Sequence, residues 1–289
     1  MPTTSVPDVA AAHAAEVRQG ERFAFGRNWQ HFLQTIDEER IAVATAALAE
    51  MLEVTSLAGK RFIDIGSGSG LSSLAARRLG AEVLSFDYDP QCVACGQELK
   101  ARFAPDDASW TIQHGSVLDQ PFLQSLGKFD VVYSWGVLHQ TGDMWKALAH
   151  VGNLVEDGGT LFISIYNDQG GKSRRWRAIK RLYCRSPQLV QTLLVLAVGS
   201  WWETRDFFVR LVRLQNPLPF ADWAKKKKTR GMSVWHDLVD WVGGYPFEVA
   251  RPEEVFDFFR ARGFVLTRLK TEGCGHGCNE YVFDRMGAP

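Results

Sequence analysis

The sequence predicts an α/β fold, a doubly wound and mostly parallel seven-stranded sheet with helices on both faces. Short apolar segments alternate regularly with amphipathic helical segments between Arg61 and Tyr166, which is typical of parallel sheets with crossover helices. A glycine-rich turn directly follows the first apolar segment, at Asp64–Gly70. The stretch 167–252 breaks the alternation, and its composition is helical rather than loop-like.

The elements follow in order along the chain. Apolar runs predict strands, and helical periodicity predicts the segments between them. The short connection before the last strand leaves no room for a helix, so we expect the final pair to form a hairpin. The predicted strands are Arg61–Ile65, Glu82–Phe86, Trp110–Gln113, Phe129–Ser134, Thr160–Tyr166, Phe264–Lys270 and Asn279–Asp284, and the predicted helices are Asp37–Leu52, Leu71–Leu79, Pro90–Phe103, Met144–Leu154 and Glu253–Arg262.

We expect four parts. Residues 1–55 form an N-terminal helical segment, mobile until about Glu21. Residues 56–170 form the ligand-binding core, and 171–250 form a helical insertion that caps the carboxyl edge of the sheet. Residues 251–289 complete the core with a helix and two strands. Lys172–Tyr183 and Leu189–Leu214 are the helical stretches of the insertion.

The balance of charge argues against a polyanionic partner. Lys and Arg total 33, Asp and Glu total 33, and the net charge is zero. Binding to nucleic acid is therefore not expected, because general electrostatic attraction is missing. The sequence gives no prediction of oligomeric state, and a small-molecule substrate is the expected partner.

The cysteines and the N-terminus favour a cytoplasmic protein. Five cysteines form no regular disulfide framework, so we expect reduced thiols. No apolar stretch follows a basic start, so a signal peptide is not expected. No metal site is predicted, because the Cys92/Cys95 pair lies within a helix and the alternation of Cys274, His276 and Cys278 lacks a fourth ligand.

The glycine-rich turn predicts a ligand site at the carboxyl ends of the strands. Gly66, Gly68 and Gly70, with Ser67 between them, let the backbone pass close to a ligand. Asp87 ends the second strand, where a carboxylate accepts hydrogen bonds from ribose hydroxyls, and Tyr88 follows it. A nicotinamide or flavin site requires glycine where Leu71 stands. The acid Asp64 before the turn suits a ligand with an ammonium group.

These motifs resemble those of class I methyltransferases that depend on S-adenosylmethionine (SAM), which have a Rossmann-like fold. Asp64-x-Gly66-x-Gly68-x-Gly70 is similar to their first motif, and Asp87 to their ribose-binding acid. The run Phe129–His139, which includes Ser134 and Trp135, resembles their fourth-strand motif. The resemblance implies SAM as cofactor, with Ser116 and Val117 flanking the adenine. Many family members have Asp at the position of Ser116, and Asp119 or backbone atoms are alternatives here.

Candidates for substrate contact follow the fourth and fifth strands. His139 has a side chain suited to act as a base near neutral pH, although it would also fit a packing role. Tyr166 and Asn167 leave the fifth strand, and His236 in the insertion is a second candidate base. In the aromatic segment Phe23–Trp29, we expect Arg27 to reach the SAM carboxylate and Trp29 to cover the cofactor; the alternative is an anchor that packs on the sheet.

The insertion combines basic residues with an apolar helix. This combination suits contact with an anionic membrane surface, although it also fits a packed cap with a solvated charged face. The basic residues are Arg174, Arg175, Arg177, Lys180, Arg181, Arg185 and Lys225–Lys228, and the large apolar residues include Trp201, Trp202, Phe207 and Phe208. Trp235 and Trp241 are expected to line a pocket.

The sequence therefore predicts a SAM-dependent methyltransferase that acts on a small-molecule, lipid-like acceptor, by O-methylation. The chain loosely resembles ubiquinone-type O-methyltransferases, which are similar in carrying an insertion after the fifth strand. Three alternatives remain: a protein or nucleic-acid methyltransferase, a SAM-binding module without catalysis, and a nicotinamide oxidoreductase. The sequence lacks the Asn/Asp-Pro-Pro-Tyr/Phe motif of base N-methylation, which argues against nucleic-acid methylation. Leu71 disfavours the oxidoreductase.

Overall fold

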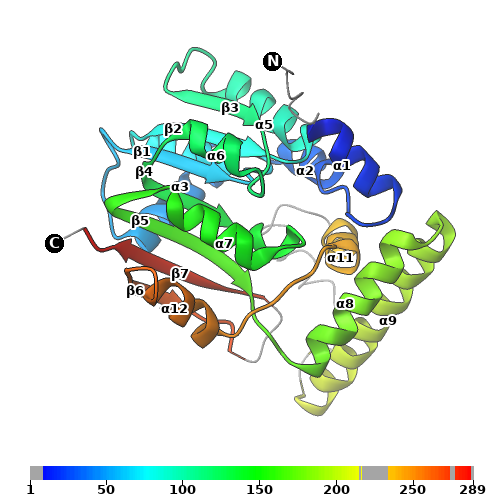
Figure 1. Cartoon of the computed structure of the whole chain (residues 1–289). Coiled ribbons are helices and arrows are strands. Elements are labelled where there is room, and N and C mark those ends of the chain that lie inside the picture. Colours follow the sequence, from blue (N-terminus) through cyan, green and yellow to red (C-terminus); the bar gives the residue numbers. More distant parts are fainter. Residues whose placement is uncertain (1–8, 215, 217–233, 274–276, 288–289) are drawn as a thin grey trace, which may run out of the picture.

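The core is a seven-stranded sheet in the order β3-β2-β1-β4-β5-β7-β6, as the computed structural model shows (Figure 1). The structure describes residues 9–214, 216, 234–273 and 277–287. Only β7 runs antiparallel to its neighbours, β5 and β6, so the predicted fold class and the terminal hairpin are confirmed. The strands are β1 (Arg61–Ile65), β2 (Glu82–Asp87), β3 (Trp110–His114), β4 (Phe129–Trp135), β5 (Val155–Tyr166), β6 (Phe264–Lys270) and β7 (Cys278–Arg285).

Helices cover both faces of the sheet because successive side chains of each strand point to opposite faces. Phe62 packs on one face with residues of α3, α4 and α5, and Ile63 packs on the other with residues of α6, α7 and α12. The helices are α1 (Val9–Arg18), α2 (Gly26–Leu33), α3 (Glu38–Leu52), α4 (Leu71–Arg78), α5 (Pro90–Phe103), α6 (Gln120–Leu126), α7 (Met144–Asn153), α8 (Gly171–Arg185), α9 (Gln188–Val212), α11 (Val234–Gly243) and α12 (Pro252–Arg260), with the short 3₁₀ helix η1 (Leu138–Gln140).

Local capping sets where several helices begin. The carboxylate of Asp37 accepts a hydrogen bond from Arg40 N before α3, and Asp119 does the same with Phe122 N before α6. Asp89 precedes Pro90 at the first turn of α5 and accepts from Gln91 N. Such acceptors satisfy backbone donors that the first turn leaves unpaired.

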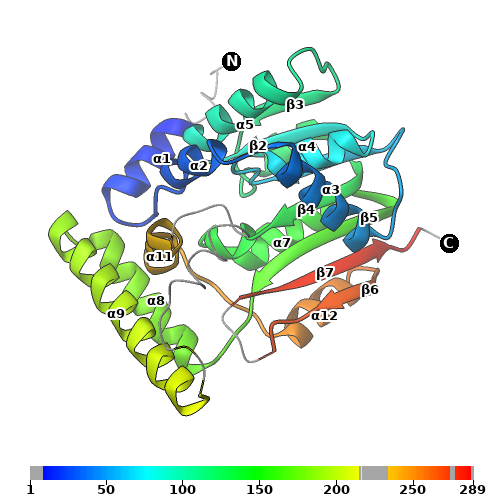
Figure 2. The same ribbon diagram turned by 180° about the vertical axis from the view of Figure 1, so that it is seen from behind.

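The helices α8, α9 and α11 form a layer beside the carboxyl ends of the strands (Figure 2). Tyr183 of α8, Val195 of α9 and Val242 of α11 make a small apolar core of their own. No helix in the described ranges is long and apolar enough to cross a membrane. The basic run Lys225–Lys228 lies outside the described residues.

The N-terminal segment differs from the expectation of a mobile tail. Residues from Val9 onward form α1, and His13 on this helix is buried against the Tyr88 ring and Asp89. Helix α2 was also not predicted. Both helices depend on docking to the end of β2, a tertiary contact that local sequence patterns do not report.

Candidate functional site

The glycine turn lies where the strand order reverses, between β1 and β4. Gly66, Gly68 and Gly70 all have positive φ angles, of 76°, 55° and 81°, which side chains other than glycine rarely adopt. A Cβ on Gly66 would lie 2.4 Å from Val137 Cγ1. The backbone of this turn is therefore fixed against the segment that follows β4, and it is bare of side chains at the place where doubly wound sheets bind ligands.

Asp64 is buried beneath the turn. Its Oδ2 accepts a 2.6 Å hydrogen bond from Ser73 Oγ of α4. Burial raises the pKa of Asp64 to about 7; the bond from Ser73 opposes this rise, and the charge of Asp87 adds to it. A cationic ligand nearby would favour the ionised form.

Asp87 holds the turn from the end of β2. Its two oxygens accept 2.9 Å hydrogen bonds from Gly68 N and Asp89 N. Burial raises the pKa of Asp87 to about 6 against the effect of these bonds. The neighbouring Tyr88 donates its hydroxyl to Glu16 at 3.0 Å. The structure thus places Asp64 and Asp87 together at the turn and engages the Tyr88 hydroxyl with α1.

Helix α2 covers the glycine turn. A Cβ on Gly68 would lie 3.0 Å from Trp29 Cε2, so the indole of Trp29 packs directly on the turn. Gly26 N donates to Asp89 Oδ2 at 2.9 Å, which anchors the start of the helix at the end of β2. The side chain of Arg27 is exposed, whereas Asn28 points inward and donates to Asp240 of α11.

The remaining cofactor candidates form hydrogen bonds within the fold. Ser116 Oγ accepts from Leu118 N at 3.2 Å, and the carbonyl of the buried Val117 contacts His150 Nδ1 at 2.8 Å. Ser134 donates to the Ile65 carbonyl at 2.9 Å and so ties the ends of β4 and β1 together. Trp135 is half-exposed and donates to Glu280 of β7. Asp119, the alternative to Ser116, caps α6.

His139 is fully buried beside Tyr166. Its Nδ1 accepts a 3.3 Å hydrogen bond from Tyr166 N, and the two ring centroids lie 4.0 Å apart. Burial, followed by the charge of Lys180, lowers the pKa of His139 to about 3. An imidazole whose Nδ1 accepts has its proton on Nε2. In this state His139 is a hydrogen-bond donor, which disfavours the predicted role as a base.

Two other predicted substrate contacts fall elsewhere. The Asn167 amide donates to the Gly273 carbonyl at 2.8 Å and accepts from Asn279 at 3.1 Å, so it ties the end of β5 to the β6–β7 connection. His236 lies on α11, but its side chain is outside the described residues. Among the four candidates, the structure brings together His139 and Tyr166.

A buried polar cluster was missed by sequence reasoning. Lys180 is fully buried and does not belong to the solvated basic face in which its spacing grouped it. Its Nζ donates to the Trp241 carbonyl and lies 4.6 Å and 4.9 Å from the ring centroids of Trp241 and Phe247. Burial lowers the pKa of Lys180 to about 7, although Asp240 opposes the fall. The only local signal in the sequence was helical spacing, which places Lys180 on the same face of α8 as Trp176 and Tyr183.

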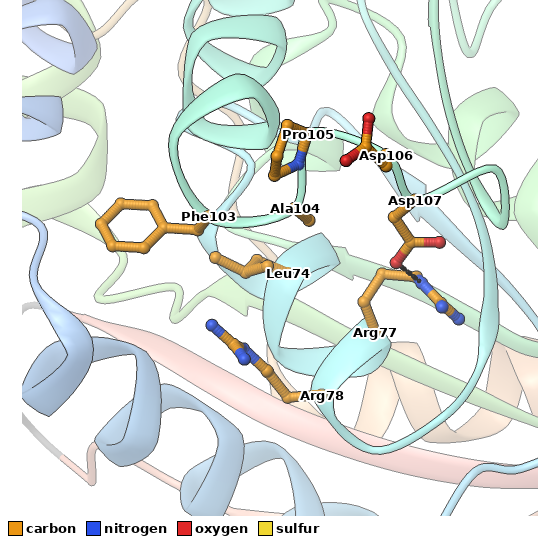
Figure 3. Close-up of a pocket in the computed structure, with 8 residues that line it drawn as sticks. All are labelled: Leu74, Arg77, Arg78, Phe103, Ala104, Pro105, Asp106 and Asp107. Atoms are coloured by element: carbon orange, nitrogen blue, oxygen red, sulfur yellow. Dashed lines mark hydrogen bonds and ion pairs between the residues drawn. The ribbon is translucent and has the colours of Figure 1, made fainter.

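One surface pocket lies away from this region (Figure 3). It has a volume of about 440 Å³ and lies between the ends of α4 and α5. Arg77 pairs with Asp107 there at 2.6 Å, and Arg78 pairs with Glu38. Both arginines of this pocket are therefore paired within the fold.

Comparison with known proteins identifies the family. A family model described as "Methyltransferase domain" matches residues 33–212, which is more than half of the chain. The chain therefore belongs to this family. Residues 33–212 include the glycine turn, Asp87, His139 and Lys180.

Curated relatives resemble part of the chain. It is 34% identical over 112 residues to the ubiquinone biosynthesis O-methyltransferase of Xanthomonas campestris pv. campestris (strain B100), covering 39% of this chain and 45% of that protein. The protein of the same description from Methylococcus capsulatus is 29% identical over 114 residues, covering 39% and 46%. The matches therefore span less than half the length of these relatives.

Solved structures share the fold. Magnesium protoporphyrin IX methyltransferase from Synechocystis PCC 6803, crystallised with bound SAM, superposes with a TM-score of 0.52 at 12% identity and covers 98% of this chain and 100% of that one. An O-methyltransferase family protein from Burkholderia thailandensis gives a TM-score of 0.50 at 16% identity, with 98% and 69% covered. At these identities the likeness concerns the fold alone.

Proposed function

We propose that this methyltransferase-domain protein transfers a methyl group from SAM to an oxygen atom of a small-molecule acceptor. The observation that carries the proposal is the glycine turn at the strand-order reversal, held by the partly buried carboxylate of Asp87, with the buried carboxylate of Asp64 beneath it. The names of the partial relatives, ubiquinone biosynthesis O-methyltransferases, support oxygen as the methylated atom.

The residues around the turn fit SAM. The bare backbone of Gly66 and Gly68 accommodates a close ligand, and the carboxylates match its positive charge and its ribose hydroxyls. Ser67 Oγ is buried and has no hydrogen-bond partner within the described ranges, so it offers a further polar contact. When bound, SAM supplies an electrophilic methyl group on its sulfonium. Trp29 would then shield this group from water.

On the acceptor side, Tyr166 and Trp241 pack edge to face, with ring centroids 5.8 Å apart, and together offer an aromatic surface. His139 Nε2–H is a donor for an acceptor oxygen. This lining suits a small planar molecule better than a protein or nucleic-acid chain, and the zero net charge points the same way. Arg27 remains our candidate for the SAM carboxylate, by rotation of its exposed side chain.

Calorimetry separates the cofactor alternatives. We expect saturable binding of SAM and no binding of NAD. Tight NAD binding without SAM binding would overturn the proposal. Incubating the protein with methyl-labelled SAM and the small-molecule fraction of a lysate, followed by mass spectrometry, should then reveal a labelled methyl ether or ester. SAM binding without any labelled product would favour a binding module instead.

We also infer that α9 contacts an anionic lipid surface. Its outward side carries large apolar side chains, including Leu189 and Leu193, which are 73% and 55% exposed, and Phe208. The exposed residues Arg174, Arg181 and Arg185 lie on the adjacent helix α8. Apolar residues beside arginines suit the boundary between acyl chains and anionic headgroups.

Vesicle flotation tests this contact. The protein should float with vesicles containing phosphatidylserine and remain unbound with neutral vesicles. The double variant Leu189→Asp/Leu193→Asp should lose flotation, whereas Val43→Asp, which changes an equally exposed apolar residue of α3, should keep it. If the wild type does not float, and the double variant instead dissociates a dimer, a second copy of the chain covers α9 and the lipid proposal is wrong.

A further inference from the structure

Lys180 occupies an unusual place for a lysine. It lies on α8, fully buried where α8 meets α11 and the Phe247 segment. Burying an ammonium group is costly unless it is well paired. Its one hydrogen bond among the described residues, to the Trp241 carbonyl, leaves two further N–H donors.

Two separate chains of contacts connect Lys180 to the glycine turn. On one side, the Phe247 ring lies 4.9 Å from Lys180 Nζ and packs on Tyr166, which packs on His139. His139 follows two residues after Val137, the residue that packs on Gly66. On the other side, Gly68 packs on Trp29, and the adjacent Asn28 donates to Asp240, next to Trp241. The lysine is therefore linked to the glycine turn through two sets of packing and hydrogen-bond contacts.

The buried donor His139 belongs to this cluster too. Its Nε2 is buried and has no partner that meets hydrogen-bond distance and angle within the part of the chain that is described, although the Ser164 backbone lies close enough to the ring to raise its pKa. Because Nδ1 accepts from Tyr166 N, Nε2 carries the proton. An unpaired buried donor is costly, and an acceptor oxygen from a ligand would remove this cost.

A purely structural role for Lys180 is the competing explanation. Its bond to a carbonyl in the last turn of α11 caps that helix, and a cation is favoured at this end of the helix dipole. A partly exposed lysine would cap the end of α11 equally well. It explains neither the full burial nor the unpaired donor of His139.

We propose that Lys180 binds an anionic oxygen on an aromatic ring of the methyl acceptor, with His139 Nε2–H as a second donor. The rings of Trp241 and Tyr166 meet edge to face, so one ring would stack on the planar ring that bears this oxygen and the other would meet its edge. This inference rests on the proposed function and narrows its acceptor to phenolates or aromatic carboxylates. Burial lowers the pKa of Lys180, and a bound anion would hold it protonated.

The other titratable groups near Lys180 come from three elements. Asp240 lies on α11, Cys184 on α8 and His139 on η1. Burial raises the pKa of both Asp240 and Cys184, to about 7 and about 12. Lys180 is therefore the cation in this cluster that can pair with an incoming anion.

A chromogenic phenol tests the proposal. p-Nitrophenol turns yellow on ionisation, and we would titrate it into the protein at a pH below its own pKa. Wild type should bind it saturably and produce the phenolate absorbance band. Lys180→Met should bind at least about tenfold more weakly and produce no band. Lys172→Met, which removes an exposed lysine of the same helix, should behave as wild type.

Calorimetry then measures the affinity of wild type and Lys180→Met for 4-nitrobenzoate, an anion, and for nitrobenzene, a neutral analogue. A Lys180-dependent affinity for 4-nitrobenzoate would extend the site to carboxylates, and neutral nitrobenzene should bind wild type and Lys180→Met alike. The proposal fails if neither anion shows binding that depends on Lys180. It also fails if wild type binds p-nitrophenol without the phenolate band, a result that does not depend on how well the variant folds.

The same samples separate this inference from the proposed function. SAM binding measured with wild type tests the methyltransferase proposal independently of the lysine. If SAM binds and the phenolate band is absent, only the anion site is wrong. If the band appears and SAM does not bind, the proposed function is wrong and an anion site remains.

Discussion

The Asn28 amide donates a hydrogen bond to the Asp240 carboxylate and so joins α2 to α11 across 212 positions of the chain. Asn28 is buried next to Trp29, which packs on Gly68. Asp240 is adjacent to Trp241, whose carbonyl accepts from Lys180. This hydrogen bond thus links helix α2, which covers the glycine turn, to the layer formed by α8, α9 and α11.

Replacing Asn28 should destabilise the protein in a pH-dependent way. Asn28→Ala leaves a buried carboxylate without this donor, a loss of about 1–3 kcal/mol in the free energy of unfolding. Burial raises the folded-state pKa of Asp240 to about 7 and Asn28 opposes this rise, so the variant should have a still higher pKa. Its deficit should therefore grow as pH rises through about 7. Urea unfolding at several pH values measures it, with the exposed Gln30→Ala as control; a constant or shrinking deficit would contradict the role of the pair.

Asp87 should contribute strongly to cofactor affinity. Asp87→Ala removes the acceptor of Gly68 N and the carboxylate proposed for the ribose, so SAM binding should weaken about tenfold or more. Asp106→Ala, an exposed acid far from the turn, should leave affinity unchanged. Calorimetry at one pH compares the three proteins. Equal affinity for Asp87→Ala and wild type would show that Asp87 does not hold the cofactor.

SAM should bind more tightly as pH rises from about 5 to about 8. Burial raises the pKa of Asp64 to about 7 and that of Asp87 to about 6, so both are partly protonated in the free protein within this window. A cationic ligand favours their ionised forms, and binding should therefore release protons. Because both folded-state pKa values lie above the ordinary value of about 3.9, these groups also make the free protein less stable as pH rises from about 4 to about 7. Calorimetry in buffers with different ionisation enthalpies counts the protons; uptake of protons would refute the assignment.

Gly66 should be intolerant of a side chain for two separable reasons. Gly66→Ala places a Cβ in an unfavourable positive-φ conformation and 2.4 Å from Val137 Cγ1. Gly158→Ala has the same φ of 76° but nothing within 4 Å, so it measures the backbone cost alone, about 1–2 kcal/mol. Thermal or urea unfolding should show a larger loss for Gly66→Ala, by about 1–3 kcal/mol from overpacking. Equal losses would mean that Val137 moves aside freely.

His139 should remain neutral through the physiological range. Burial lowers its pKa to about 3, below the ordinary value of about 6.5 for an unfolded chain. Its contribution to stability is therefore complete above about pH 6.5 and is lost as pH falls towards 3. Long-range ¹H–¹⁵N NMR should show an Nε2–H tautomer that does not titrate between about pH 5 and about pH 8. A midpoint near the ordinary value would restore His139 as a candidate base.

Elements that depend on local interactions were predicted from the sequence, whereas features that depend on contacts between distant residues were missed. Short strands such as Arg61–Ile65 and Glu82–Asp87 were predicted closely because local hydrophobicity decides them. The helix α2 was missed because its stability comes from Asp89 and Asp240, which are distant in the chain. Lys180 was grouped with its basic neighbours since helical spacing alone does not show which neighbours bury a side chain.

The sequence by itself determined the doubly wound sheet and the place of the glycine turn, because strand periodicity and glycine backbone freedom are local properties. It also placed Asp64 and Asp87 at that turn, since Asp64 is the last residue but one of β1 and Asp87 ends β2. Only the tertiary structure decided that α1 and α2 fold over the end of β2, that His139 is a buried donor and that Lys180 lies inside. Those outcomes depend on desolvation and on partners far apart in the chain, and neither is encoded in local spacing.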